Sequence, residues 1–209
     1  MKVSLPAIRT VARTNIRHVA RALHGLSRGK LTPNMVTMFG FLMHVPIAYL
    51  IATEHNLWAA VLLVLFGLFD TLDGELARLQ KRESDGGGLL DAATDRMKEV
   101  LLYTGAASAL IASSHPKMAV WAVAACGASI CVSYVKAKGE ATVARTKHQI
   151  PYTQLNKMFA DGLVPFEVRM AMLVVGLLVG QLGFALVIIT ILASYTAFQR
   201  LFKITKQLS

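Results

Sequence analysis

The sequence predicts an all-α integral membrane protein, and three observations lead to this prediction. Apolar residues make up 55% of the 209 residues, and the mean hydropathy is positive at +0.51. These residues gather in runs of about 17 to 25, the length that a helix needs to cross a bilayer. The amino-terminal segment instead repeats apolar residues at helical spacing between basic ones. We therefore expect six transmembrane helices preceded by an amphipathic helix at the membrane surface.

The amino-terminal segment, residues 1–30, predicts the interfacial helix. Its apolar residues recur on one face of a helix, while arginines repeat every four residues. A basic amphipathic helix of this kind fits against anionic lipid headgroups in the membrane interface. Pro33, in "LTPN", cannot continue a helix interior and separates this segment from the rest. We divide the chain into the interfacial helix, 1–30, and a transmembrane domain, 31–209. The repeating arginines are Arg9, Arg13, Arg17 and Arg21.

The six predicted spans follow in order and share a length near that of a bilayer-crossing helix. An even number of spans places both termini on the same side of the membrane. The second and third spans carry charged residues at one end only, on either side of the turn "KRESDGGG". The spans are residues 34–53, 57–78, 89–113, 117–137, 166–182 and 184–203.

The formal net charge of +10 raises the question of a nucleic-acid partner. The basic residues, however, gather before the first span, in alternate loops and in the tail, while the opposite side offers only Lys117. This asymmetry follows the positive-inside rule, so nucleic acid is not expected as a partner. It predicts a multi-pass protein of the plasma membrane with both termini and the loop after the second span in the cytoplasm. The segment between the fourth and fifth spans contributes Lys138, Arg145, Lys147 and Lys157.

Four aspartates lie at the ends of the second and third spans that face this loop. Asp70 and Asp73 are three residues apart and Asp91 and Asp95 are four apart, so each pair lies on one helix face. Two antiparallel helices joined by the loop would place the pairs opposite each other. Four like charges in one small space require cations. Oxygen ligands suit Mg²⁺ or Mn²⁺, which in proteins commonly serve phosphate chemistry.

The aspartates could also serve in a protein that has no metal-dependent reaction. They could be helix-end charges in contact with solvent. They could instead line the path of a cation channel or transporter, which would be a non-enzymatic function. Transporters usually carry internal repeats and midplane sites, whereas this sequence shows no repeat and its aspartates cluster towards one membrane face. An enzyme with a metal site is therefore the favoured interpretation.

The residues around the aspartates form a spaced signature, D-x2-D-G-x2-A-R-x8-G-x3-D-x3-D, over positions 70 to 95. This signature resembles that of the CDP-alcohol phosphotransferase family, with its spacing unbroken. The six-span layout, the amphipathic first helix and "LTPNMVT" before the first span extend the resemblance over most of the chain. The fixed positions are Asp70, Asp73, Gly74, Ala77, Arg78, Gly87, Asp91 and Asp95.

The resemblance implies an enzyme that transfers a phosphatidyl group from CDP-diacylglycerol to an alcohol and releases CMP. It implies two divalent ions, Mg²⁺ or Mn²⁺, with Asp95 also acting as general base. It further implies a homodimer. The implied metal ligands are Asp70, Asp73, Asp91 and Asp95, and the implied CDP-binding residues are Gly74, Ala77, Arg78, Thr32 and Pro33.

The acceptor alcohol must be inferred from residues outside the signature. Ser133 and Lys136 share a helix face at the end of the fourth span, Arg169 opens the fifth and Arg200 ends the sixth. Lysine and arginine are good phosphate partners. The set is similar to that of phosphatidylinositol-phosphate synthases and favours inositol phosphate as acceptor, although Phe166 stands near a position where those relatives carry an arginine. The alternative is a phosphatidylglycerophosphate synthase that uses glycerol 3-phosphate.

Overall fold

The computed structural model describes residues 5–145 and 164–208, and within these ranges it is helical with no strand. Residues 1–4 of the predicted interfacial helix, and Lys147 and Lys157, lie outside the described part. The predicted spans correspond in order to α2, to α3 and α4 together, and to α5, α6, α8 and α9. The helices are α1 (Leu5–Leu26), α2 (Pro33–Ala52), α3 (Asn56–Gly67), α4 (Phe69–Gln80), α5 (Asp85–Ala112), α6 (Ala119–Arg145), α8 (Phe166–Leu178) and α9 (Leu182–Leu208).

Four helical segments of the described chain are long and apolar enough to cross a membrane. They are Pro33–Ala52, Asn56–Gln80, Pro116–Val143 and Leu182–Lys206. Charged residues interrupt the apolar sequence of helix α5. Helix α8 has only 13 residues, a length of about 20 Å, whereas the hydrocarbon core of a bilayer is about 30 Å thick. The described part of the chain is thus helical, and its four candidate spans indicate a membrane protein. The count of six spans stays a prediction.

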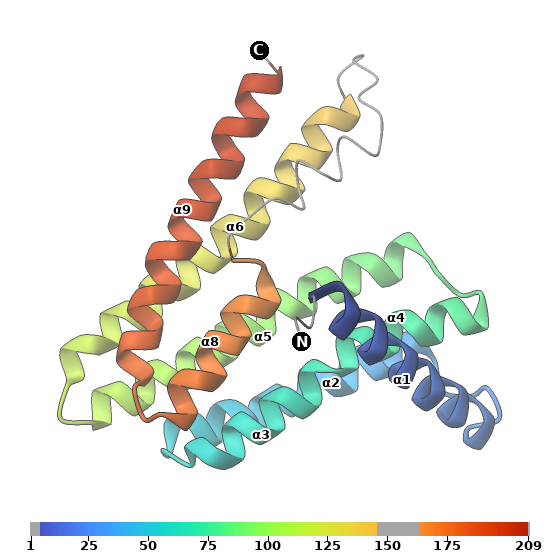
Figure 1. Cartoon of the computed structure of the whole chain (residues 1–209), viewed down its shortest axis with the longest axis horizontal. Helices are drawn as coiled ribbons and strands as arrows, with labels where there is room; N and C mark the ends of the chain where they lie inside the picture. Colours follow the sequence, from blue (N-terminus) through green and yellow to red (C-terminus); the bar gives the residue numbers. More distant parts are fainter. Residues whose placement is uncertain (1–4, 146–163, 209) are drawn as a thin grey trace.

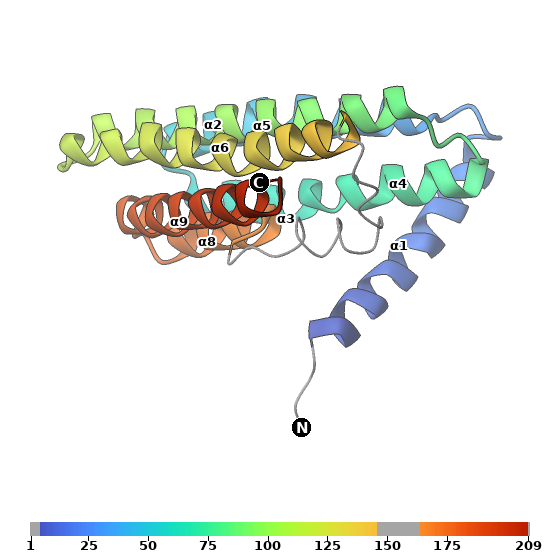
Figure 2. The same cartoon turned by 90° about the horizontal axis from the view of Figure 1, so that it is seen from above.

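The helices pack in two layers, which Figure 2 shows edge-on. One layer contains α2, α5 and α6, and the other contains α9, α8, α3 and α4. In Figure 1, α6 and α9 run side by side, and α5 pairs with α2. Helix α1 diverges from the layers and packs on α4 through a small core that includes Ala20, Leu72 and Leu76. The main core lies between the layers and holds Ile47, Leu102 and Leu186.

Local signals fix the α4–α5 hairpin on which the aspartates stand. Helix α4 ends at Lys81, which adopts the left-handed conformation with φ of 53°. Ser84 begins α5, and its hydroxyl accepts a hydrogen bond from the Gly87 backbone N–H at 3.1 Å. A serine cap satisfies one of the backbone donors that a helix start leaves unpaired. The hairpin is therefore short, and it brings the charged end of α4 beside that of α5.

Gly105 allows α5 to approach α2 closely, and this contact supports a first prediction. A Cβ atom at this position would overlap the backbone carbonyl of Ala48 on α2. Gly105→Ala should therefore lower the free energy of unfolding by about 1–3 kcal/mol, the usual cost of overpacking. Gly127→Ala is the control, because a Cβ there meets no atom of another described helix within 4 Å. Thermal unfolding in detergent checks this, and equal stability of the two variants would contradict it.

Candidate active site

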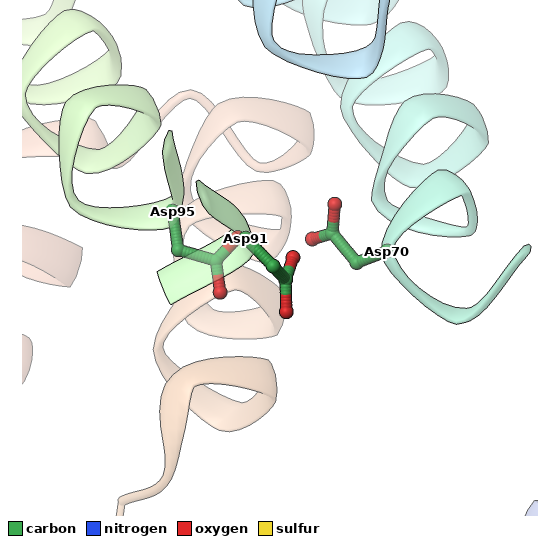
Figure 3. Close-up of side chains that lie close together, drawn as sticks. All are labelled: Asp70, Asp91 and Asp95. Carbon is green, nitrogen blue, oxygen red and sulfur yellow. The ribbon is translucent and has the colours of Figure 1, made fainter. Parts of the chain in front are cut away.

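Three carboxylates from two helices converge in the structure (Figure 3). Asp70 reaches in from α4, and Asp91 and Asp95 project from successive turns of α5. One oxygen of each lies within 4.8 Å of the others. All three side chains are partly buried. The opposed arrangement that the spacing predicted is therefore present for these three aspartates.

The donor set fits a hard divalent cation. Oxygen ligands are the ones that Mg²⁺ and Mn²⁺ prefer. One oxygen of Asp91, Oδ1, is buried and has no hydrogen-bond partner among the described residues. A buried carboxylate oxygen without a partner is costly, and a bound cation would compensate that cost.

Lys98 supplies positive charge to this cluster and was not predicted from the sequence. Its fully buried ammonium group donates hydrogen bonds to Asp70 Oδ1 and, at 3.2 Å, to Asp95 Oδ1. It thereby ties α4 to α5 across the cluster. The sequence did contain a signal for Lys98: it follows Asp95 by three residues, on the same face of a predicted span. Ionisable residues within spans usually have a partner or a function.

Asp73, the fourth predicted ligand, is oriented differently. Its Oδ2 accepts a hydrogen bond of 2.5 Å from the hydroxyl of Thr37 on α2. It is buried and lies outside the group of three converging carboxylates. A metal-binding role for Asp73 therefore stays a prediction.

A first cavity, of about 230 Å³, lies between α2, α4 and the start of α5. Asp73 and Asp91 stand on its wall. Four of the five predicted CDP-binding residues line it as well, namely Pro33, Gly74, Ala77 and Arg78. The fifth, Thr32, is not among the lining residues, because its hydroxyl caps α2 by accepting a hydrogen bond from the Met35 N–H.

Glu75 connects Arg78 of the first cavity to α1. This buried carboxylate accepts hydrogen bonds from Arg78 at 2.9 Å and from Arg17 at 3.0 Å. Helix α1 thus contributes to the position of a residue on the cavity wall. Sequence reasoning did not single out Glu75, although it stands within the spaced signature at a variable position.

A second cavity, of about 620 Å³, lies on the other side of Asp91. Its wall carries Asp91 and Asp95 together with all four residues predicted for the acceptor phosphate, Ser133, Lys136, Arg169 and Arg200. These four come from α6, α8 and α9, so only the tertiary packing brings them together. Asp91 lines both cavities, so one carboxylate of the cluster is shared between them.

Ion pairs to Glu99 and hydrogen bonds to backbone carbonyls hold the arginines of the second cavity. Arg169, only 1% exposed, donates to Glu99 Oε1 at 2.7 Å and to the Val164 carbonyl at 2.9 Å. The same Glu99 oxygen accepts from Arg96 at 3.3 Å. Arg200 donates to the Val132 carbonyl at 3.3 Å. Sequence reasoning missed Arg96 and Glu99, and again the signal was charge inside a predicted span.

Comparison with known families agrees with this geometry. A sequence model of the family described as CDP-alcohol phosphatidyltransferase matches residues 30–198, which is most of the chain. The chain belongs to the CDP-alcohol phosphatidyltransferase family. The matched region includes α2 to α6, α8 and most of α9. The first cavity lies wholly within it, and so does the second cavity apart from Arg200.

Relatives of this chain include a phosphatidylinositol phosphate synthase from Corynebacterium glutamicum. The two are 42% identical over 117 residues, which are 54% of this chain and 53% of that protein. The chain thus aligns with about half the length of this relative. A phosphatidylinositol phosphate synthase of Cutibacterium acnes is 33% identical over 126 residues, 58% of this chain and 60% of that protein.

Among solved structures, the fold of this chain is similar to that of the Mycobacterium tuberculosis phosphatidylinositol phosphate synthase. The structure of that enzyme with CDP-DAG bound superposes with a TM-score of 0.76 at 24% identity, covering 90% of this chain and 92% of that chain. At this identity the likeness shows a shared fold.

Proposed function

We propose that this protein transfers a phosphatidyl group from CDP-diacylglycerol to a phosphorylated polyol, with inositol phosphate as the favoured acceptor. The observation that carries the proposal is the position of Asp91 on the walls of both cavities, within a cluster of three carboxylates. Such a site can hold the two reactants on opposite sides of one reacting centre. Membership of a phosphatidyltransferase family favours this function over a cation channel or transporter.

The first cavity is the proposed CDP site. Gly74 and Ala77 leave room for a nucleotide close to the α4 backbone. Arg78, braced by Glu75, offers a guanidinium to phosphate oxygens. Pro33 lies on the same wall. Thr32 would contribute indirectly, because its hydroxyl caps the first turn of α2, which carries Pro33.

The carboxylate cluster is the proposed metal site, with Asp70, Asp91 and Asp95 as the ligands that the geometry supports best and Asp73 as a further one. Two bound divalent ions, Mg²⁺ or Mn²⁺, would neutralise charge on the pyrophosphate and on the departing CMP. Lys98 would keep Asp70 and Asp95 in place by its hydrogen bonds to both.

The proposed reaction is a phosphoryl-type displacement. The acceptor hydroxyl oxygen forms a bond to the phosphorus that carries the diacylglycerol, and the bond from this phosphorus to the bridging oxygen breaks. CMP leaves with that oxygen, and the hydroxyl proton passes to Asp95. A carboxylate is a suitable general base for a hydroxyl whose acidity is raised beside a metal ion.

The second cavity is the proposed acceptor site. Ser133, Lys136, Arg169 and Arg200 provide one hydroxyl and three cationic groups on its wall, which suits an anionic acceptor better than serine or ethanolamine. Glycerol 3-phosphate needs the same groups and is the second candidate. The relatives from Corynebacterium glutamicum and Cutibacterium acnes, both phosphatidylinositol phosphate synthases, favour inositol phosphate.

We also propose the membrane arrangement that the sequence predicts. Residues 1–30 would lie in the interface and 31–209 would form a six-span domain, with the termini and both cavities at the cytoplasmic side of the plasma membrane. The four apolar helices and the packing of α1 on α4 are compatible with this arrangement. Cysteine accessibility of the α4–α5 loop in intact cells tests the orientation. A homodimer is proposed from the family resemblance.

Release of CMP tests the proposed function. Purified protein with CDP-diacylglycerol and Mg²⁺ should release CMP with inositol phosphate, and removal of the divalent ion by EDTA should stop the reaction. Glycerol 3-phosphate, inositol and serine serve as comparison acceptors. Turnover with glycerol 3-phosphate alone would assign the second candidate, and no CMP with any acceptor would refute the enzyme.

A further inference from the structure

Arg96 lies on the wall of the second cavity beside the carboxylate cluster. It directly follows Asp95 in α5, and its side chain is 25% exposed. Its NH1 group donates to the hydroxyl of Ser133 on α6. It therefore connects a predicted metal ligand with a residue predicted for the acceptor phosphate.

Contacts from three helices fix the orientation of this guanidinium. Glu99, one turn further along α5, accepts from NH1 at 3.3 Å, and NH2 lies 3.7 Å from Asp95 Oδ2. The guanidinium carbon stands 5.3 Å from the ring centre of Phe166, the first residue of α8. A cation over an aromatic face is stabilised electrostatically, more strongly where water is partly excluded.

These contacts leave Arg96 donors for a ligand. A guanidinium has five N–H donors. The hydrogen bonds to Ser133 and Glu99 use NH1, and among the residues that the structure describes NH2 makes only a long ion pair, with Asp95. The Arg96 side chain is 25% exposed, whereas that of Arg169 on the same wall is 1% exposed. Arg96 thus presents more of its side chain to the cavity than Arg169 does.

Among the described residues of the cavity wall, acidic and basic side chains are equal in number, so their charges balance only while the carboxylates hold no cation. The acidic residues are Asp91, Asp95, Glu140 and Glu167, and the basic ones are Arg96, Lys136, Arg169 and Arg200. Glu140 lies 3.9 Å from Lys136, so each can offset the other. If divalent cations neutralise Asp91 and Asp95, as the proposed function requires, the wall becomes positive around Arg96 and attracts an anion.

We propose that Arg96 binds the phosphate monoester of the acceptor and that the Phe166 ring is the platform that positions it. This inference rests on the proposed function, because it assigns the acceptor to the second cavity. Arg96 stands between the proposed base, Asp95, and Ser133. An acceptor whose hydroxyl faces Asp95 would thus have its phosphate within reach of Arg96 and Ser133 together.

The test uses the full-length protein in lipid nanodiscs with Mg²⁺. The variants are Arg96→Gln, Arg96→Lys, Phe166→Leu and Phe166→Tyr. Lys138→Gln is the matched control, because it removes one positive charge from α6 outside the cavity. The measurements are kcat, the KM values of acceptor and CDP-diacylglycerol, and equilibrium binding of inositol phosphate and glycerol 3-phosphate by calorimetry.

Arg96→Gln should weaken acceptor binding and raise the acceptor KM by about 10- to 100-fold, the effect of losing a charge-assisted hydrogen bond. The KM of CDP-diacylglycerol should stay within about twofold of wild type, because Arg96 does not line the first cavity. Phe166→Leu should weaken acceptor binding by about 3- to 10-fold. Phe166→Tyr should weaken it less than Phe166→Leu does, and Arg96→Lys less than Arg96→Gln does.

Two results would overturn the proposal. One is acceptor binding by Arg96→Gln that matches the Lys138→Gln control, and the other is an equal rise in both KM values. The binding measurement separates this proposal from the proposed function. If wild type binds a phosphate monoester without releasing CMP, and Arg96→Gln loses that binding, the anion site stands and the transferase assignment fails.

Discussion

Asp95→Asn is expected to reduce CMP release by about 10²- to 10⁴-fold or more, the usual contribution of a general base. The carboxylate also belongs to the cluster of three and accepts a hydrogen bond from Lys98, so the substitution removes both the proposed proton acceptor and a proposed metal ligand. Asparagine has nearly the same size, and the packing should be preserved. Binding of CDP-diacylglycerol should change little, because Asp95 does not line the first cavity.

The measurement is CMP release together with a binding assay for the CDP-lipid. Asp85→Asn is the control, since Asp85 lies exposed in the first turn of the same helix and lines neither cavity. It should retain wild-type turnover. Turnover by Asp95→Asn at the level of this control would contradict the role of the cluster in the reaction.

Glu99→Gln is expected to have the largest effect on stability. Its buried Oε1 accepts from Arg169 at 2.7 Å and from Arg96 at 3.3 Å. The substitution keeps the side-chain shape but leaves Arg169 buried without its opposite charge. Breaking a buried ion pair by removing one partner costs about 3–5 kcal/mol. The free energy of unfolding in detergent should fall by an amount of this order.

Glu140→Gln provides the comparison for this prediction. Its partner Lys136 lies 3.9 Å away, and both side chains are exposed, so the stability change should stay below about 1 kcal/mol. A double change, Glu99→Leu with Arg169→Met, should recover part of the loss because no unpaired charge remains. Equal stability of Glu99→Gln and Glu140→Gln would show that the buried network contributes little.

The sequence alone determined the helices and the centre of the site. The length of the apolar runs predicted the positions of α2, of α3 with α4, and of α5, α6, α8 and α9, because bilayer thickness and helix rise fix that length. The spacing of the aspartates and the short turn between their helices predicted that Asp70 and Asp73 would face Asp91 and Asp95. Three of these four, Asp70, Asp91 and Asp95, do converge. Run length and residue spacing are local properties of the chain, so they can be read from the sequence without knowledge of the tertiary structure.

Tertiary packing decided which side chains face the site. Asp73 and Asp70 point about 60° apart around α4. Because α2 packs on the side of α4 that carries Asp73, this carboxylate accepts a hydrogen bond from Thr37. In the same way, Lys98, Arg96 and Glu99 acquire roles only because α4, α6 and α8 present partners to α5. Periodicity assigns residues to one face of a helix. The rotation of that helix against its neighbours depends on side-chain packing between distant segments, so only the folded structure determines which partners the face meets.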